Sequence, residues 1–309
     1  AMPDSPLKTI LDREEPLMHL REHFTPQITL LKELANYGSN LIFRAFQSSD
    51  KGMGDAIVCG VLLKQVVAMI DAVETLLSSA CVHPAHLAGR ALFEASIYLE
   101  WILRGDPEEK AICYYVSNLR AERTWALRAI QGTPEHQNFK TQTIDLDYDI
   151  HDSQPTLESE AKNHLDEVNR ILYQRKFRAI DESFEEKKRK AKREPRWYSG
   201  HGVASIRQLA NSIGRKAEYN LFYSIASEIT HSASYKNHIR FAGKQIKFKP
   251  IRNLEGISIL LHFVFIATFR TYRVVLEHYR SGELPSFRKK YLEEWQSSFW
   301  SIKAVKYDF

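Results

Sequence analysis

Apolar residues recur at three- and four-residue intervals along most of the chain, a pattern typical of helices that bury one face against a core. Glycine, proline and polar clusters interrupt the pattern and mark helix ends. In the first half, the pattern predicts a helix that begins after Pro26 and continues to residue 46, followed by helices over residues 55–81, 83–105 and 107–131. The short connections between them favour antiparallel neighbours in a bundle.

The second half is less regular. Residues 132–155 carry glycine, proline, threonine and aspartate without a period, so we expect an irregular connection there. The pattern then predicts a long charged helix (156–192), a short helix (203–213), a helix over 219–231, a strand at 244–249, an apolar helix (253–280) and a last amphipathic helix after Pro285.

Together these elements predict an all-α, multi-helix bundle with a long irregular and charged excursion in the middle and at most one short β-hairpin. We expect a single all-α domain over residues 1–309, with its core in 26–131 and 197–309. The excursion, with its long charged helix, occupies 132–196. A division into two domains near residue 150 is the alternative.

Composition narrows the possible functions only a little. The 309 residues are 44% hydrophobic and carry a net charge of +5, which permits nucleic-acid binding without favouring it. The three cysteines lack zinc-site spacing, and the first residues lack the pattern of an export signal, so we expect a reduced, cytoplasmic protein. The most apolar stretches, 56–73 and 257–268, are interrupted or too short to span a bilayer, which predicts buried helices and no membrane contact.

A row of polar side chains follows the helix predicted at 219–231. Tyr219, Tyr223, Ser227 and His231 recur every four residues and lie beside an apolar stripe, so they wind along one flank of the helix. Histidine is the residue best suited to move a proton near neutral pH, and Ser227 lies one turn before it. The row predicts a polar site at the edge of the core, or hydroxyls and a ring that satisfy carbonyls at a helix contact.

Arg90 and Glu94 interrupt a helix that is apolar nearly all round. Both fall on the face of Leu87, Ile97 and Trp101, so we expect both charges to point inward and to pair with each other. The alternative to a purely structural ion pair is that they charge a site shared with the row at 219–231. An arginine there suits an anion, and a glutamate suits a proton or a metal.

A metal centre is a weaker interpretation of the same helix. Glu228 and His231 fit Glu-x-x-His, half of a carboxylate-bridged di-metal motif, but no second copy occurs on another predicted helix. If a metal is bound, Glu228, His231 and Glu94 are its candidate ligands. We otherwise expect no metal and no cofactor, because P-loop, dinucleotide-binding and nucleophile-elbow motifs are absent from the sequence.

The basic run at residues 187–193 is followed by Arg196, Trp197 and Tyr198, which together suit phosphates and stacked bases. On this interpretation Trp197 helps to bind a substrate such as RNA. The alternative is a solvated helix end with Trp197 anchoring the next turn in the core.

Two resemblances add to these patterns. With Arg90-Ala-Leu-Phe-Glu94, Trp197 and the row from Tyr219 to His231, the chain resembles a family of bacterial all-helical proteins known only as a domain of unknown function, number fifty-six seventy-seven of that series. The likeness spans roughly residues 55–270 and implies that these helices meet in space.

More loosely, the chain resembles helical-bundle ribonucleases of toxin and phage-defence systems. Their active helix carries an arginine, a polar residue and then a histidine, and two copies face each other in a dimer. Here Ser227 and His231 match, whereas the arginine would have to come from Arg90 on a neighbouring helix or from Arg240. This resemblance implies RNA as a partner and a homodimer.

The first hypothesis is therefore a cytoplasmic helical-bundle ribonuclease without metal, of a toxin or bacterial defence type. In it the catalytic residues are His231 as general acid and base, Arg90, which stabilises phosphate charge, and Ser227, which with Tyr223 positions the substrate. The substrate-binding residues are Tyr223, Tyr219, Glu94 and Trp197. The alternative is a non-catalytic bundle with a buried polar network or a site for a small anionic ligand. A metal-dependent hydrolase is the third hypothesis.

Overall fold

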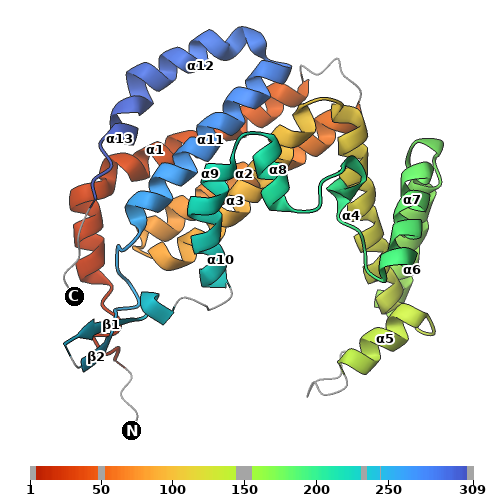
Figure 1. Cartoon of the computed structure of the whole chain (residues 1–309), viewed down its shortest axis with the longest axis horizontal. Coiled ribbons are helices and arrows are strands. Elements are labelled where there is room, and N and C mark those ends of the chain that lie inside the picture. Colours follow the sequence, from red (N-terminus) through yellow and green to blue (C-terminus); the bar gives the residue numbers. More distant parts are fainter. Residues whose placement is uncertain (1–4, 48–52, 144–154, 231–234, 244, 305–309) are drawn as a thin grey trace. The chain divides into compact units, whose positions relative to one another are not determined.

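Helices account for nearly all regular structure in the described part of the chain, which comprises residues 5–47, 53–143, 155–230, 235–243 and 245–304 of a computed structural model (Figure 1). One two-stranded antiparallel hairpin completes it. The prediction of an all-α bundle with at most one short β-hairpin is confirmed. The chain divides into two compact units, which we describe separately: unit 1, formed by Ala1–Gly105 and Ser205–Phe309, and unit 2, Asp106–Ala204.

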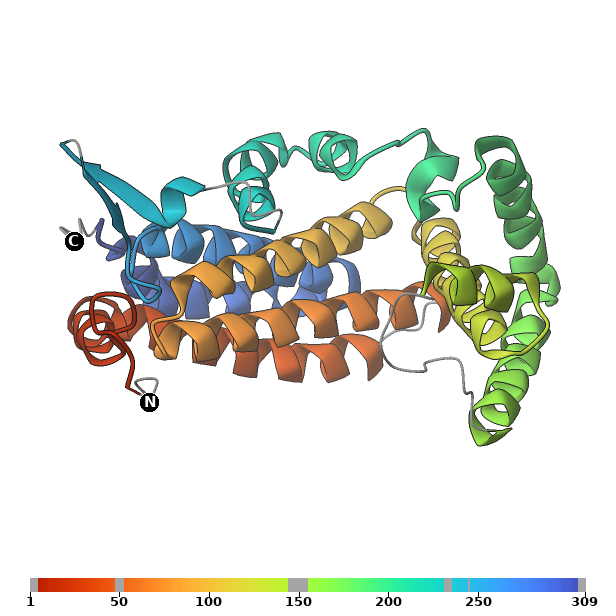
Figure 2. The same ribbon diagram turned by 90° about the horizontal axis from the view of Figure 1, so that it is seen from below.

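Four long helices build the core of unit 1: α1 (Glu14–Gln47), α2 (Met53–Ser78), α3 (Val82–Leu103) and α11 (Ile257–Tyr279). Helix α2 packs against α1 and α3, and α11 packs against α1 and α3, so the four surround one apolar interior (Figures 1 and 2). Leu31, Leu34, Val66, Phe93 and Val264 are fully buried there. Their spacing is the apolar periodicity seen in the sequence.

Gly38 lets two of these helices approach closely. A Cβ atom at this position would lie 2.1 Å from the Tyr272 hydroxyl oxygen and 2.6 Å from a Val67 methyl carbon, so no larger side chain fits. The buried Tyr272 hydroxyl donates a hydrogen bond of 2.7 Å to the Leu34 carbonyl oxygen. The missing side chain and this hydrogen bond together fix α11 against α1.

Two segments, Asp55–Ser78 in α2 and Ile257–Tyr279 in α11, are long and apolar enough to cross a membrane by length and composition alone. In their most apolar stretches, 44% and 61% of the residues are buried inside the structure. Core helices have the same composition, so burial accounts for much of the apolar character of α11.

The remaining elements of unit 1 lie around this core. They are α8 (Ile206–Ser212), α9 (Lys216–Glu218), η2 (Tyr219–Tyr223), α10 (Ser224–Thr230), η3 (Tyr235–Asn237), β1 (Ile239–Ala242), β2 (Gln245–Phe248), η4 (Ser281–Glu283), α12 (Leu284–Lys290), η5 (Tyr291–Trp295) and α13 (Gln296–Trp300). The hairpin pairs Ile239 with Phe248 and Ala242 with Gln245. Trp295 is fully buried, and its ring N–H donates to the Glu33 carboxylate at 2.9 Å, which anchors the C-terminal helices on α1.

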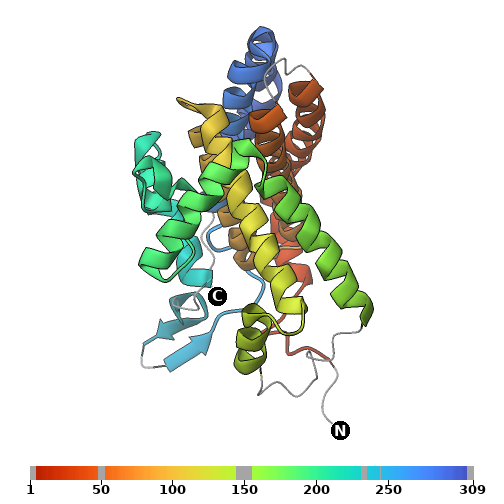
Figure 3. The ribbon, with the colours of Figure 1, turned by 90° about the vertical axis from the view of Figure 1, so that its right-hand side faces the viewer.

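Unit 2 is organised around α4 (Pro107–Ala129), which packs against α5 (Pro134–Gln142), α6 (Pro155–Leu172), α7 (Arg175–Ala191) and η1 (Trp197–His201) (Figure 3). Asp106 caps α4 by accepting a hydrogen bond of 3.1 Å from the Glu109 N–H. Val168, Leu172 and Phe184 are the buried apolar anchors of α6 and α7.

Three expected boundaries differ from the structure. The first helix begins at Glu14, after an Asp12 cap, and continues through Pro26, because buried Leu20, Phe24 and Ile28 extend the packed face across the proline. The long charged helix is two helices, interrupted at Tyr173–Gln174, although no glycine or proline marks the break. The connection expected at 132–155 contains α5, which Thr133 caps and Pro134 begins.

Candidate functional site

The polar row lies on one continuous helical segment formed by α9, η2 and α10, with η2 wound as a π-helix. Buried Phe222 and Ala226 hold this segment against α3. A π turn inserts one extra residue relative to α-helical spacing, and such turns are frequent at functional sites. The sequence pattern predicted a regular α-helix here, because hydrophobic periodicity does not distinguish one wide turn.

Arg90 is the centre of the polar contacts that link α3 to this segment. Its Nε atom lies 3.2 Å from the Glu94 carboxylate, Nη1 donates to the Thr230 hydroxyl at 2.9 Å, and Nη2 donates to the Tyr223 hydroxyl at 2.8 Å. The Tyr223 hydroxyl in turn donates to Glu94 at 2.9 Å. The guanidinium carbon also lies 4.5 Å from the centre of the Tyr223 ring. These contacts form the Arg90 network: Arg90, Glu94, Tyr223 and Thr230.

Charge and burial fix the protonation states in this network. Partial burial disfavours the charged form of Arg90, but Tyr223 and Glu94 outweigh it, so its pKa lies above the ordinary value. Burial and the neighbouring Glu94 raise the pKa of Tyr223 to about 12. At neutral pH, Tyr223 is therefore a neutral donor to Glu94 and an acceptor from Arg90. All three guanidinium nitrogens already have partners inside the protein.

The Arg90 network lies at the edge of the core. The side chains of Arg90 and Glu94, which we expected to point inward, are 21% and 29% exposed and therefore half-buried. The reason is that α10 covers their face of α3 only in part, and Leu87 on the same face is 43% exposed.

The structure brings together only some of the predicted site residues. Tyr219 stacks on Tyr223 with ring centres 4.7 Å apart, which extends the Arg90 network by one aromatic ring. Ser227 is half-buried and Glu228 is exposed on α10. His231 lies outside the described residues. Trp197 belongs to unit 2, where it is buried edge-on against Tyr114, as expected of a core anchor.

A second, deeper polar group was not singled out from the sequence. Glu100 on α3 is 1% exposed, and both of its carboxylate oxygens accept hydrogen bonds of 2.8 Å from Arg270 on α11. Arg104 approaches the same carboxylate at 2.5 Å and Arg215 at 3.6 Å. We call these four residues the Glu100 cluster. In the sequence, the only sign of this cluster was the position of Glu100 beside Trp101 in a helix that is apolar nearly all round.

Arg215 ties the Glu100 cluster to the start of the site segment. Its side chain is fully buried and donates to Glu218 at 2.6 Å and to the Ser96 hydroxyl at 2.6 Å. Thr271 on α11 also donates to Ser96, at 2.7 Å. Every charge in this region has a buried partner, so the cluster fixes α3, α9 and α11 together.

A cavity of about 250 Å³ lies on the other flank of α10. It is lined by residues of α3, α10, the hairpin region and the start of α11: His83, Pro84, His86, Ile225, Ile229, Asn237, His238, Lys249, Pro250, Ile251, Asn253, Glu255, Gly256 and Ile259. We call it the histidine cavity. None of its histidines belongs to the row predicted at 219–231, and spacing along the sequence gave no sign that His238 joins the other two.

His86 is the unusual side chain of the histidine cavity. It is 5% exposed and lies against the Phe222 ring, with ring centres 5.8 Å apart, and its Nδ1 atom has no hydrogen-bond partner among the described residues. Burial, with a smaller contribution from His83, lowers the pKa of His86 to about 4. Burial and His238 likewise lower the pKa of His83. These two imidazoles are therefore neutral at pH 7.

The single lysine lining the cavity is neutralised within it. Lys249 lies 2.6 Å from the Glu255 carboxylate, and its side chain is 12% exposed. Because Lys249 and Glu255 contact each other and His83 and His86 are neutral, these four residues offer hydrogen bonds without an unpaired charge.

Comparison with known proteins gives a family and no function. No curated protein and no solved structure matches the chain. A family model described as a family of unknown function, DUF5677, matches residues 56–245, which is more than half of the 309 residues and includes Arg90, Glu94 and the whole site segment. The chain therefore belongs to the DUF5677 family of unknown function.

Proposed function

We propose that this chain binds a small, uncharged nitrogen heterocycle in the histidine cavity. The observation that carries the proposal is the unpartnered Nδ1 atom of the buried His86. A buried polar atom left without a partner costs roughly 1–3 kcal/mol, so a ligand that supplies the partner gains affinity from it. The His86 side chain lines the cavity while its Nδ1 atom is shielded from solvent, so a ligand would gain this hydrogen bond after a small rotation of the ring.

The remaining walls favour the same class of ligand. Ile225, Ile229 and Ile259 provide apolar surface for the faces of a ring, and the rings of His83 and His238 lie 5.3 Å apart at the cavity wall. A charged ligand would lose its hydration without finding an unpaired opposite charge, because Lys249 already contacts Glu255. We therefore propose a neutral ligand in place of the small anionic ligand expected from the sequence.

The Arg90 network has a supporting role in this proposal. It holds α10 against α3, and α10 supplies the wall residues Ile225 and Ile229. Arg90 is a positioning residue in this scheme, since it does not line the cavity.

The ribonuclease hypothesis stays a prediction. Its proton-transfer residue, His231, lies outside the described residues, and Arg90 already donates from all three nitrogens to Glu94, Thr230 and Tyr223. These contacts use three of the five guanidinium N–H groups, so a phosphate would have at most two of them to bind, and we favour ligand binding as the better supported function. The cytoplasmic location and the homodimer also stay predictions.

Ligand-observed NMR with a set of neutral nitrogen heterocycles, such as adenine, benzimidazole and indazole, tests the proposal. We expect saturation transfer to at least one of them in the wild type and its loss in Ile225→Trp, which fills the cavity. Ser224→Trp is the matched control, because Ser224 is the exposed neighbour on the same helix. Binding by no member of the set, or equal binding by Ile225→Trp, contradicts the proposal.

A cleavage assay distinguishes the ribonuclease hypothesis. Purified protein is incubated with mixed cellular RNA in a chelator, beside Arg90→Gln and His231→Ala. Cleavage that both variants abolish would favour the ribonuclease over the ligand-binding protein, whereas intact RNA together with heterocycle binding favours our proposal.

A further inference from the structure

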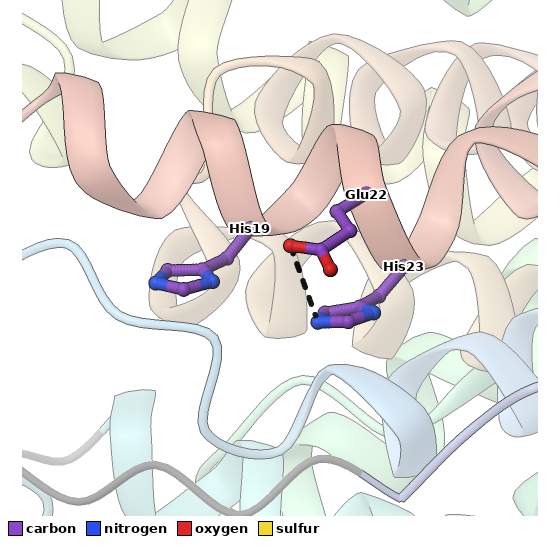
Figure 4. A group of neighbouring side chains, drawn as sticks. All are labelled: His19, Glu22 and His23. Carbon is purple, nitrogen blue, oxygen red and sulfur yellow. Dashed lines mark ion pairs between the residues drawn. The ribbon is translucent and has the colours of Figure 1, made fainter.

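A cluster of possible metal ligands lies on α1, separate from the histidine cavity. His19, Glu22 and His23 occupy positions i, i+3 and i+4 of the helix and therefore share one face (Figure 4). One ligand atom from each lies within 4.8 Å of the other two. We searched the described residues for three histidine, cysteine or acidic side chains close enough to share one metal ion, and these three form the group that meets the condition.

The geometry is close to that of a chelate. The two imidazole rings are nearly parallel, with an angle of 10° between them and ring centres 6.4 Å apart, and His23 Nε2 lies 3.8 Å from a Glu22 carboxylate oxygen. Bonds from a zinc ion to histidine nitrogen and carboxylate oxygen are about 2.0–2.2 Å long, so small side-chain rotations bring the three atoms onto one ion. Glu22 is exposed and both histidines are half-buried, so solvent leaves the three side chains room to rotate.

The helix beneath the cluster is held firmly. Leu20 and Phe24, the residues that follow each histidine, are 4% and 0% exposed and pack in the core of unit 1. The backbone that carries the ligands is thus fixed, so the entropic cost of binding an ion comes mainly from ordering the three side chains.

We propose that His19, Glu22 and His23 form a surface site for a divalent transition-metal ion, with Zn²⁺ as its typical occupant. Two imidazole nitrogens and one carboxylate oxygen are a ligand set that suits Zn²⁺, Ni²⁺ and Cu²⁺ and disfavours Mg²⁺ and Ca²⁺, which prefer oxygen alone. Solvent completes the coordination, so the site is accessible. It is independent of the proposed heterocycle binding.

Calorimetric titration of the full chain with Zn²⁺ tests this proposal. We expect one ion per chain in the wild type, and affinity at least about tenfold weaker in His19→Gln, His23→Gln and Glu22→Gln. His164→Gln is the matched control, because His164 also contacts a single glutamate, Glu122, at 3.2 Å but has no second imidazole in that pair. The control should bind as the wild type does.

A control for folding accompanies the titrations. Unchanged circular-dichroism melts without metal show that the variants fold. The double variant His19→Gln/His23→Gln must lose the site while its heterocycle binding stays intact. Zinc uptake by this variant equal to that of the wild type, or the absence of zinc uptake by the wild type, overturns the proposal.

Discussion

In each unit a buried charge is surrounded by several opposite charges, but the signs are reversed. In unit 1, the Glu100 carboxylate is contacted by Arg104, Arg215 and Arg270. In unit 2, Arg120 on α4 is contacted by the carboxylates of three acidic residues, Asp181, Glu185 and Glu194. The central side chains are 1% and 2% exposed, so the two regions bury their central charge to the same extent.

The two regions differ in how deeply the partners of the central charge are buried. Arg215 in unit 1 is as deeply buried as Glu100, whereas Glu185 and Glu194 in unit 2 are 50% and 42% exposed. A buried partner that loses its counter-charge keeps the full penalty of desolvation, while an exposed partner turns to water. We therefore expect the Glu100 cluster to be the less replaceable of the two.

The largest effect is expected for Glu100→Gln. The variant keeps the shape of the side chain but leaves the buried Arg215 and the half-buried Arg270 short of one negative charge, which should lower the free energy of unfolding by about 3–5 kcal/mol. Urea unfolding measures this, with Glu94→Gln as the same change at a half-buried carboxylate. Equal losses in both variants would contradict the importance of burial.

Acid should destabilise unit 1 through His86. Because burial lowers its pKa from 6.5 to about 4, the folded state binds this proton less readily than the unfolded state. The stabilising effect is complete above about pH 6.5 and is lost as the pH falls towards 4, a loss of about 3 kcal/mol in order of magnitude. Unfolding measured from pH 7 to 4 should show a slope that His86→Phe reduces, while His83, whose pKa is also lowered, keeps a part of it. An unchanged slope in the variant would exclude His86 as the cause.

Arg120→Met tests the cluster of unit 2 and should cost less, about 1–3 kcal/mol, because two of the three acidic partners reach water. Limited proteolysis and urea unfolding measure the change. Arg178→Met is the control, since Arg178 and Glu182 form an exposed pair, and its effect should lie within experimental error.

The same variant should alter the acid response of unit 2. Burial alone would raise the pKa of Asp181, but hydrogen bonds from Arg123 and Arg120 outweigh it and the pKa is lowered; a hydrogen bond from Arg120 lowers the pKa of Glu185. Lowered values stabilise the fold above the ordinary carboxylate pKa and cease to do so as acid protonates these groups. Arg120→Met should weaken this dependence below about pH 4; a full acid response in the variant would argue against Arg120 as its source.

The smallest effect is expected at the Arg90 network. Tyr223→Phe removes the hydroxyl that joins Arg90 to Glu94, and should cost about 0.5–1.5 kcal/mol, because Arg90 and Glu94 keep their direct contact and are half-buried. Tyr219→Phe keeps the stacked ring and is the matched control in thermal unfolding. A larger loss for Tyr219→Phe would show that the network is not held by the Tyr223 hydroxyl.

Much of the fold was predictable from local patterns. The apolar periodicity of α2, α3 and α11 and the Asp106 cap of α4 depend on residues a few positions apart, so the sequence shows them directly. The predicted start of the first helix and the single charged helix predicted over 156–192 were wrong. Packing across Pro26 and packing onto α4 decide where these helices begin and end. The contact of Arg90 with Glu94 was also predictable, since the two lie one turn apart.

The sequence by itself determined the helical class, most helix positions, and side-chain pairs that share one helix, such as Arg90 with Glu94 and the spacing of His19 and His23. Only the tertiary structure brought Tyr223 and Thr230 to Arg90, brought Arg215 and Arg270 to Glu100, and placed His83, His86 and His238 around one cavity. The physical reason is the separation along the chain over which each interaction acts. Periodicity and capping act over a few residues, whereas burial and the contacts between distant charges depend on how whole helices pack.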